Sequence, residues 1–297
     1  MRKMFLVICL LVFSVANVFS KETTNVPKDS SVYKYKQTQD LVSLVKYAAL
    51  AVEEKGEAAF PEFKKENSQW RHDDIYIFII DTNGNMVLHP DPALEGKNEM
   101  GLKDADNRLI VKGFINTVSN NKREGWFHYL WPEPGSIFPL WKSSFLQLVV
   151  APSGKKYIVG SGLYNMKIEK EFIVNLVDLA AVLIEEEGRA AFPKLRDKTG
   201  RFMFMDIYVF VDKPDGVELV NGAFPNIEGR NLIDYKDSKG SFLVRNYIKI
   251  ALTEGSGWVD YLWPKPGEAT PSEKYTYVKK VKYGDETFIV GAGAYLE

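Results

Sequence analysis

Residues 125–135 read Gly-Trp-Phe-His-Tyr-Leu-Trp-Pro-Glu-Pro-Gly, and residues 257–267 repeat this string as Gly-Trp-Val-Asp-Tyr-Leu-Trp-Pro-Lys-Pro-Gly, 132 residues later. Other pairs share this spacing or nearly so, including Phe60-Pro61 with Phe192-Pro193, Tyr76 with Tyr208, Lys142 with Lys274, and Gly160-Ser161-Gly162 with Gly291-Ala292-Gly293. Such self-similarity over a long period indicates that the chain is one structural module present twice.

Each copy shows the same order of predicted elements. Apolar residues at helical spacing predict helices over residues 40–55 and 169–187, which end at Gly56 and Gly188. In the first copy two strands follow, over residues 75–80 and 86–88, and a second helical period runs from about 109 to 118. Three further strands complete each copy. Short turns between strands favour an antiparallel sheet, so we expect an α+β fold.

Composition and charge exclude several classes of protein. The chain has 297 residues, 45% of them hydrophobic and 26% charged, with a formal net charge of -1. This composition is typical of a soluble globular protein, and it lacks the basic field that nucleic acid or anionic lipid attracts. The single cysteine, Cys9, lies near the N-terminus. Disulfides and cysteine metal sites are therefore not expected in the mature protein.

The N-terminus reads as an export signal. Arg2 and Lys3 precede an apolar run over residues 4–13, which predicts a cleaved signal peptide over residues 1–20. The alternative is an uncleaved membrane anchor. Residues 21–36 are polar and lack an apolar period, so they are predicted to form a flexible leader. A periplasmic or secreted location follows from these predictions.

The repeated strand offers candidates for a binding pocket. Alternation along a strand places Phe127, Tyr129 and Trp131 on one face of the sheet. Aromatic rings with a polar tip can line a pocket and donate a hydrogen bond, although the same rings are also common as core residues. Lys142 and Lys274 persist in both copies while their neighbours change. An ammonium there could meet a carboxylate ligand; the alternative is an ordinary surface lysine.

The residues give little support for an enzyme. His72, His89 and His128 all lie in the first copy, so a histidine-dependent reaction common to both copies is excluded. The acidic neighbours of His72 are too close in sequence to form a convincing metal site. Gly160-Ser161-Gly162 lacks the third glycine of a dinucleotide-binding loop. We therefore expect no catalytic residues, no metal and no cofactor.

A set of motifs resembles a known family. The long helix, residues 81–90 (DTNGNMVLHP), Gly96-Lys97-Asn98, the repeated aromatic string, Lys142 and residues 159–164 (VGSGLY) are similar to the single-Cache sensor domain of bacteria. The second copy resembles it through residues 229–231 (GRN) and 290–295 (VGAGAY). The two copies are assigned to residues 37–166 and 167–297. The resemblance implies two PAS-like modules, each with an antiparallel sheet of about five strands, a long N-terminal helix and a small-molecule pocket.

The resemblance also implies pocket residues and a function. The candidate ligand-binding residues are Tyr76, His89, Tyr129, Trp131 and Lys142 in the first copy and Tyr208, Tyr261, Trp263, Lys274 and Tyr277 in the second. Two departures alter the pockets: Phe145 corresponds to Tyr277, and Phe224-Pro225 stands for His89-Pro90.

The expected function is that of an exported protein that binds a short organic acid or a similar metabolite. No membrane-spanning or signalling segment follows the second copy in this sequence. The expected partner is therefore a separate membrane-bound receptor, kinase or transporter, and not a nucleic acid. The alternative is a ligand-free interaction module that uses the loops at residues 132–135 and 264–267.

Overall fold

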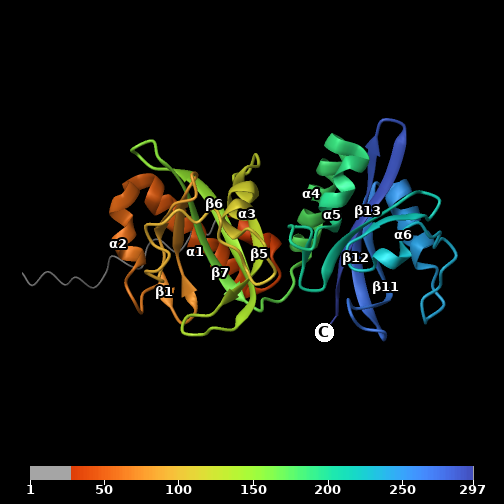
Figure 1. Ribbon diagram of the computed structural model, residues 1–297, viewed down its shortest axis with the longest axis horizontal. Coiled ribbons are helices and arrows are strands. Elements are labelled where there is room, and N and C mark those ends of the chain that lie inside the picture. Colours follow the sequence, from red (N-terminus) through yellow and green to blue (C-terminus); the bar gives the residue numbers. More distant parts are fainter. Residues whose placement is uncertain (1–27, 297) are drawn as a thin grey trace, which may run out of the picture.

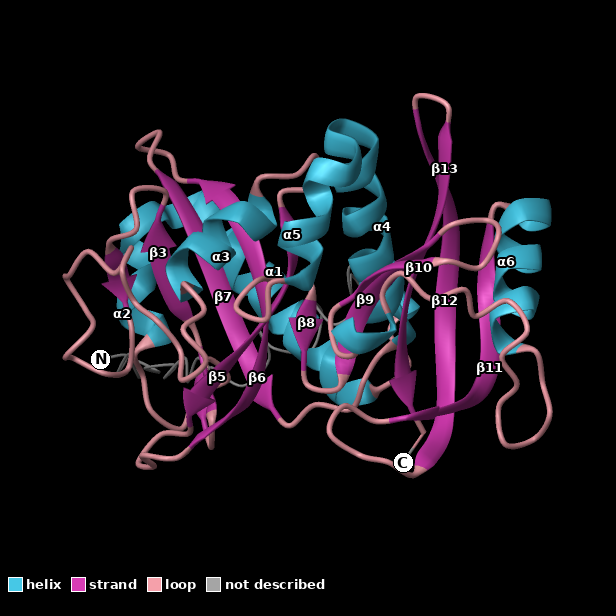
Figure 2. Ribbon diagram, turned by 45° about the vertical axis from the view of Figure 1, so that its right-hand side comes forward, coloured by secondary structure: helices cyan, strands magenta, loops and turns pink. Residues whose placement is uncertain are grey.

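The computed structural model describes residues 28–296. Module 1 (residues 28–166) and module 2 (residues 167–296) lie side by side along the longest axis of the molecule (Figure 1). Each module is an antiparallel sheet with a long helix on one face and a shorter helix on the other (Figure 2). The predicted α+β class is confirmed. The predicted signal peptide and the first part of the predicted leader lie outside the described residues.

Module 1 follows the predicted order, with short additional elements. Its elements are η1 (Lys28–Val32), α1 (Lys36–Lys55), η2 (Gly56–Ala59), α2 (Phe60–Phe63), β1 (Arg71–His72), β2 (Ile75–Tyr76), β3 (Phe78–Asp81), β4 (Met86–Leu88), α3 (Ile110–Val118), β5 (Glu124–Pro132), β6 (Pro139–Val150) and β7 (Lys156–Tyr164). The main sheet has five strands in the order β4-β3-β7-β6-β5. Helix α1 packs on β6 and β7 from one face, and α3 packs on β5 and β6 from the other.

Module 2 repeats this architecture. Its elements are α4 (Lys170–Glu187), η3 (Gly188–Ala191), α5 (Phe192–Arg196), β8 (Met203–Phe204), β9 (Ile207–Asp212), β10 (Glu218–Asn221), η4 (Pro225–Ile227), α6 (Leu243–Glu254), β11 (Ser256–Pro264), β12 (Pro271–Tyr283) and β13 (Glu286–Tyr295). The sheet order is β10-β9-β13-β12-β11, with β8 paired to β9. The corresponding strands of the two modules therefore occupy corresponding places.

Glycine ends both long helices at the predicted residues. Gly56 has φ +58° and its N–H bonds the carbonyl of Val52; Gly188 has φ +59° and bonds the carbonyl of Ile184. This left-handed backbone is accessible to glycine at little cost, and it turns the chain toward the sheet. The predicted helix ends are confirmed.

The end of the predicted leader is packed against module 1. Residues 28–32 form η1, and Tyr33 is buried. The Trp126 Nε1–H donates to the Tyr33 hydroxyl at 2.9 Å, and the two ring centres are 5.8 Å apart. The prediction of a flexible leader is therefore wrong for residues 28–35. The Tyr33 side chain packs on Trp126 of β5 and holds this segment against module 1.

The two modules share one continuous apolar core. The His128 ring on β5 stacks on the Phe204 ring of module 2, with centres 3.8 Å apart and planes 8° apart. Trp126 on the same strand contacts Phe172 of α4 at 4.8 Å. The face of β5 that points away from α3 is thus covered by module 2, so the modules are held together by buried aromatic surface.

Glu169 makes a second link between the modules. Its carboxylate accepts hydrogen bonds from the backbone N–H groups of Lys34 at 2.8 Å and Tyr35 at 2.9 Å. These groups lie immediately before α1, where backbone donors lack partners within the helix. Glu169 itself immediately precedes α4. One carboxylate therefore joins the starts of the two long helices.

Arg108 makes a third link and reaches from the loop before α3 into module 2. Its Nη1 pairs with the fully buried Asp104 carboxylate at 3.2 Å, and its Nη2 donates to the carbonyls of Lys198 at 2.8 Å and Met203 at 3.4 Å. Asp104 also accepts from the backbone N–H of Leu130 on β5 at 3.1 Å. The ion pair thus ties a strand of module 1 to module 2.

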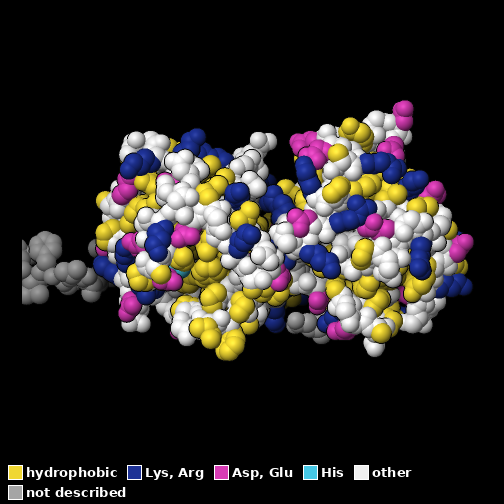
Figure 3. Space-filling model, viewed as in Figure 1, with side chains coloured by type: hydrophobic (Ala, Val, Ile, Leu, Met, Phe, Trp, Pro, Cys, Tyr) yellow, Lys and Arg dark blue, Asp and Glu magenta, His cyan; other side chains and the backbone are white. Residues whose placement is uncertain are grey.

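The surface carries mixed charge. Figure 3 shows basic and acidic side chains interspersed over the visible face of both modules. Within the described residues, no helix combines the length and the apolar character needed to cross a bilayer. Two large apolar side chains stand out at the hairpin between β5 and β6, where Ile137 is 85% exposed and Phe138 is 73% exposed.

Candidate functional site

A buried lysine lies at the centre of the module 1 site. Lys142 on β6 is flanked in register by Tyr129 on β5 and Tyr164 on β7, so the three side chains share the α3 face. Its Nζ donates to the Tyr164 hydroxyl at 3.2 Å and lies 3.8 Å from the ring centre of Tyr76. The Tyr164 hydroxyl in turn donates to the Pro132 carbonyl at 2.9 Å. Lys142 is fully buried, which contradicts the surface-lysine alternative.

Module 2 repeats this arrangement. Lys274 on β12 is flanked by Tyr261 on β11 and Tyr295 on β13. Its Nζ lies 4.0 Å from the ring centre of Tyr208 and 5.1 Å from that of Tyr295. The Tyr295 hydroxyl donates to the Pro264 carbonyl at 2.6 Å. Each site therefore consists of a lysine on one strand, a tyrosine on each of its two neighbouring strands, and a further tyrosine whose ring lies against the ammonium.

No ion pair joins Lys142 or Lys274 to a carboxylate of residues 28–296, although Asp74 acts on Lys142, and Glu218 on Lys274, from farther away. Burial lowers the pKa of Lys142 well below its usual range and lowers the pKa of Lys274 to about 7. Removing an ammonium from water is costly unless an anion accompanies it. An anion that entered either site would offset this cost at close range.

His89 adds a neutral hydrogen-bond donor to module 1. Its Nδ1 accepts the backbone N–H of Asp91 at 3.0 Å, which leaves the proton on Nε2. Burial and the nearby Lys142 charge lower the pKa of His89 to about 4, so the ring is neutral at pH 7. The ring lies 5.3 Å from that of Tyr76 and 6.3 Å from that of Trp131. It therefore joins the same aromatic cluster as Lys142.

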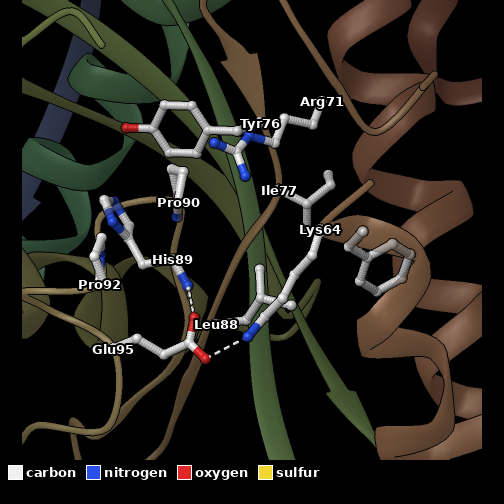
Figure 4. A pocket seen from close by; sticks show the side chains of 10 residues that line it. Lys64, Arg71, Tyr76, Ile77, Leu88, His89, Pro90, Pro92 and Glu95 are labelled. Atoms are coloured by element: carbon white, nitrogen blue, oxygen red, sulfur yellow. Dashed lines mark hydrogen bonds and ion pairs between the residues drawn. The ribbon is translucent and has the colours of Figure 1, made fainter. Parts of the chain in front are cut away.

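A cavity of about 240 Å³ opens beside this cluster. Its lining residues are Phe63, Lys64, Arg71, Tyr76, Ile77, Leu88, His89, Pro90, Pro92 and Glu95. Figure 4 shows Glu95 bonded both to the Lys64 ammonium and to the His89 backbone. Tyr76 and His89 belong to both the cavity and the lysine cluster, whereas Tyr129, Trp131 and Lys142 do not line the cavity. The lysine is thus one layer behind the cavity wall.

Module 2 has a cavity of about 20 Å³ in a different place: Lys274 itself lines it, and it shares only the positions of Tyr208 and Asn221 with the module 1 cavity. The Phe224 ring lies 5.7 Å from that of Tyr208 and 6.0 Å from that of Trp263, which is the place that His89 occupies in module 1. In sequence, the counterpart of His89 is Asn221. Each follows an equivalent strand residue, because Leu88 pairs with Ile79 in module 1 as Val220 pairs with Val211 in module 2. Module 2 therefore replaces the imidazole donor with an apolar ring.

Tyr277 lies apart from the other nine predicted residues. It is three residues from Lys274 along β12, and an odd spacing on a strand places two side chains on opposite faces. Its ring packs 5.2 Å from that of Trp258, and its hydroxyl donates to Ser256 Oγ at 2.9 Å. Tyr277 belongs to the core beneath α4, as Phe145 belongs to the core beneath α1. The change from Phe145 to Tyr277 therefore alters the core contacts and not the lysine site.

Four residues of the two sites were not predicted. Tyr164 and Tyr295 flank the lysines, while Ser144 contacts the Tyr129 hydroxyl at 3.1 Å and Thr276 donates to the Tyr261 hydroxyl at 2.9 Å. Their hydroxyl groups recur at matching positions of the two copies. That recurrence was a usable signal, because a hydroxyl retained on the pocket face of two strands needs a polar partner there.

The profile of the Cache domain family, dCache_2, matches residues 35–191 and 182–297. The chain belongs to the Cache domain family. This Cache protein is 31% identical over 115 residues to the methyl-accepting chemotaxis protein McpP of Pseudomonas putida, which covers 38% of this chain and 20% of that protein. It is 30% identical over 129 residues to the sensor histidine kinase MctS of Rhizobium johnstonii, which covers 37% of this chain and 27% of that protein. The chain thus matches about a quarter or less of each relative's length.

Solved structures similar to this Cache protein include isolated sensor domains. One is described as the periplasmic sensor domain of a chemotaxis protein; it is 29% identical, covers 42% of this chain and 92% of that chain, and has a TM-score of 0.38. Another comes from a study of carboxylic acid recognition by a Cache chemosensory domain; it is 22% identical, covers 43% and 93% of the two chains, and has a TM-score of 0.38. Each corresponds in extent to less than half of the tandem Cache chain.

Proposed function

We propose that this Cache protein is an exported sensor that binds a short organic acid in module 1. The observation that carries the proposal is the fully buried Lys142 side chain, which bonds a tyrosine hydroxyl and lies near a neutral imidazole but forms no ion pair with a carboxylate of residues 28–296. Charge-assisted hydrogen bonds in such a dry site are strong and directional. The carboxylate of the ligand would accept from Lys142 and the His89 Nε2–H, and Trp131 would wall its apolar part.

Module 1 is the better candidate for the ligand for two reasons. Its cavity of about 240 Å³ beside Tyr76 and His89 is large enough for a small metabolite, whereas the cavity that Lys274 lines in module 2 is about 20 Å³. In addition, module 1 has the His89 donor where module 2 has the Phe224 ring. The ligand would enter beside Tyr76 and His89, which separate the cavity from Lys142, and these two side chains would move as it binds.

Binding of an acid here should also involve a proton. Burial lowers the pKa of Lys142 in the unoccupied site, and a carboxylate beside it would raise that pKa again. The ligand anion and the proton on Lys142 therefore favour each other. We propose that affinity falls as the pH rises, since the neutral amine cannot pair with the anion.

The proposal extends to the location and the partner. The relatives of this Cache protein are a methyl-accepting chemotaxis protein and a sensor histidine kinase, and a similar solved domain is described as periplasmic. By analogy we place this chain outside the cytoplasm and assign it a membrane-bound receptor, kinase or transporter as its partner. Binding, and not catalysis, is the role that the site supports.

The first test is thermal unfolding of residues 21–297 against short carboxylates, amino acids, amines and purines. A ligand present at a hundred times its dissociation constant adds about 2.7 kcal/mol of stability, which corresponds to several degrees for a chain of this size. We expect shifts with one or more carboxylates and none with amines or purines. Shifts confined to amines or purines would contradict the proposed chemistry.

The alternative is a ligand-free module that binds another protein. Exposed Ile137 and Phe138 favour it, because they place two large apolar side chains at the tip of the β5–β6 hairpin next to residues 132–135. Apolar side chains in such a position are typical of interaction sites. If the carboxylate panel produced no shift, this second function would become the better explanation.

A further inference from the structure

Module 2 contains two acidic side chains inside its core. Asp212 ends β9 and Glu218 begins β10, and the two residues face each other in register across these strands. Asp212 is fully buried and Glu218 is 3% exposed. They lie on the face of the sheet covered by α6, one layer from the small cavity. Buried carboxyl groups of this kind are rare without a basic partner.

Module 1 shows that the fold does not need them. The same pair of facing strand positions holds Ile80 and Met86, which also pair in register. The α6 side chain that contacts Asp212 is Tyr247, and its counterpart on α3 is Phe114, which contacts the equivalent aromatic rings. Three apolar residues in one copy are thus three polar residues in the other. A structural role alone would be served by the apolar set.

The hydrogen bonds around the pair leave one oxygen without a donor. The Tyr247 hydroxyl donates to Asp212 Oδ2 at 2.6 Å, and the Asn221 amide donates to Glu218 Oε1 at 2.7 Å. Asp212 Oδ1 is buried and has no hydrogen-bond partner in the structure of residues 28–296. A carboxylate facing it accepts but cannot donate, whereas a protonated carboxyl group can donate. One proton on the pair supplies the missing donor.

We propose that Asp212 and Glu218 form a proton-binding site that holds one shared proton at neutral pH and gives module 2 a response to pH. The proposal is independent of the organic acid proposed for module 1. Two adjacent carboxylates in a water-excluded place cannot both ionise without a large electrostatic cost, so the proton is retained far above the usual range of a carboxyl group. The ligand of this site is the proton itself.

The surrounding charges agree with this assignment. Burial and the Asp212 charge raise the pKa of Glu218 well above its usual value, and burial raises the pKa of Asp212 to about 6. Lys274 on β12 acts in the opposite direction on Glu218. The other titratable groups of the described chain that act on the pair are the phenols Tyr208 on β9, Tyr247 on α6 and Tyr261 on β11, whose pKa values lie above their usual range. The pair therefore titrates in an environment that contains one basic group.

The direction of the pH effect follows from these shifts. The folded chain holds the protons of Asp212 and Glu218 more tightly than the unfolded chain does, so the stability they contribute is complete below about pH 4 and is lost as the pH rises through about 6 and beyond. Asn221 and Tyr247, which donate to the pair, also line the module 2 cavity beside Lys274. A change in protonation therefore changes the hydrogen bonds of the cavity wall.

The test uses the whole chain and infrared spectroscopy at pH 7. We expect a carbonyl band from a protonated carboxylic acid, and we expect its loss in Glu218→Gln, in which an amide N–H replaces the acid O–H. The same loss is expected in the triple variant Asp212→Ile, Glu218→Met and Tyr247→Phe, which copies module 1. Asp234→Asn, an exposed carboxylate paired with Arg245, is the control that should keep the band. Absence of the band in the wild type, or its survival in Glu218→Gln, would overturn the proposal.

Thermal unfolding provides a second readout. As the pH rises from about 7 to about 9 the wild type should lose several degrees relative to Glu218→Gln, because only the wild type gives up the proton that Glu218 holds above its usual range. Asp234→Asn should follow the wild type. Parallel curves for the wild type and Glu218→Gln would show that the pair does not bind protons in this range. If the triple variant fails to fold, the isosteric Glu218→Gln still decides the question.

Discussion

Lys142→Met is expected to raise the unfolding temperature of the ligand-free protein while it removes carboxylate binding. The ammonium is fully buried, and its one side-chain hydrogen bond within residues 28–296 goes to the Tyr164 hydroxyl, so an apolar side chain of similar length relieves a desolvation cost. Exchanging buried charge for a well-packed apolar group often stabilises by about 1–4 kcal/mol. Losing the charged partner of a buried anion costs about 2–5 kcal/mol of affinity, or roughly 30-fold or more.

Calorimetric titration and thermal unfolding of the same preparations check both halves of this prediction. Burial lowers the pKa of Lys142 in the folded chain, so below pH 10.5 the unfolded chain binds more protons than the folded chain does. The difference in stability between the wild type and Lys142→Met should therefore shrink as the pH rises toward 10.5. Lys274→Met is the matched control, since the same exchange in module 2 should leave carboxylate affinity unchanged. Unaltered carboxylate affinity in Lys142→Met would rule out the proposed role of this lysine.

Arg108→Ala is expected to destabilise the protein by about 3–5 kcal/mol, which is the usual cost of leaving one member of a buried ion pair without its partner. Its partner Asp104 has no exposed side-chain surface, and the guanidinium also bonds two carbonyls of module 2. Module 2 has Ser241 at the matching position, where Asp237 accepts only from backbone groups in the contacts described. Arg108 is therefore an adaptation to the contact between the modules.

Denaturant unfolding monitored by tryptophan fluorescence would measure this loss. Asp106→Asn is the control, because Asp106 also contacts Arg108 but is half exposed and should matter by less than 1 kcal/mol. The joint change Arg108→Met with Asp104→Asn, which removes both charges and keeps a side-chain acceptor for the backbone N–H groups of this loop, should cost less than the single Arg108→Ala change. Equal stability of Arg108→Ala and the wild type would mean that the pair does not hold the modules together.

The arrangement of elements was predictable because it depends on local sequence signals. The apolar spacing before Gly56 and Gly188 predicts both long helices, and the repeated string 125–135 fixes the correspondence of the later strands. Alternation along β5 also predicted that Tyr129 and Trp131 share a face. The packing of residues 28–35 was not predictable, because it depends on one aromatic contact between Tyr33 and a distant strand.

The candidate site was predictable only in part. Lys142 and Lys274 were found because they recur, and the structure places both in the same buried frame. Tyr277 was assigned by resemblance, although its odd spacing from Lys274 places it on the other face. The proximity of Asp212 and Glu218 gave no local signal, because the two residues come together only when β9 and β10 pair. Pair interactions between strands are set by register, which a single sequence does not state.

The Glu169 hydrogen bonds determine how much of this chain must be moved when a hybrid receptor is built from it. This residue precedes the helix of one copy and caps the helix of the other, through the N–H groups of Lys34 and Tyr35. A hybrid receptor that received residues 37–166 alone would lose both the carboxylate and its two backbone donors. The aromatic side chains of β5 that now meet Phe172 and Phe204 would face water. Chimaeras should therefore exchange the two copies together, with the residues that precede the first helix.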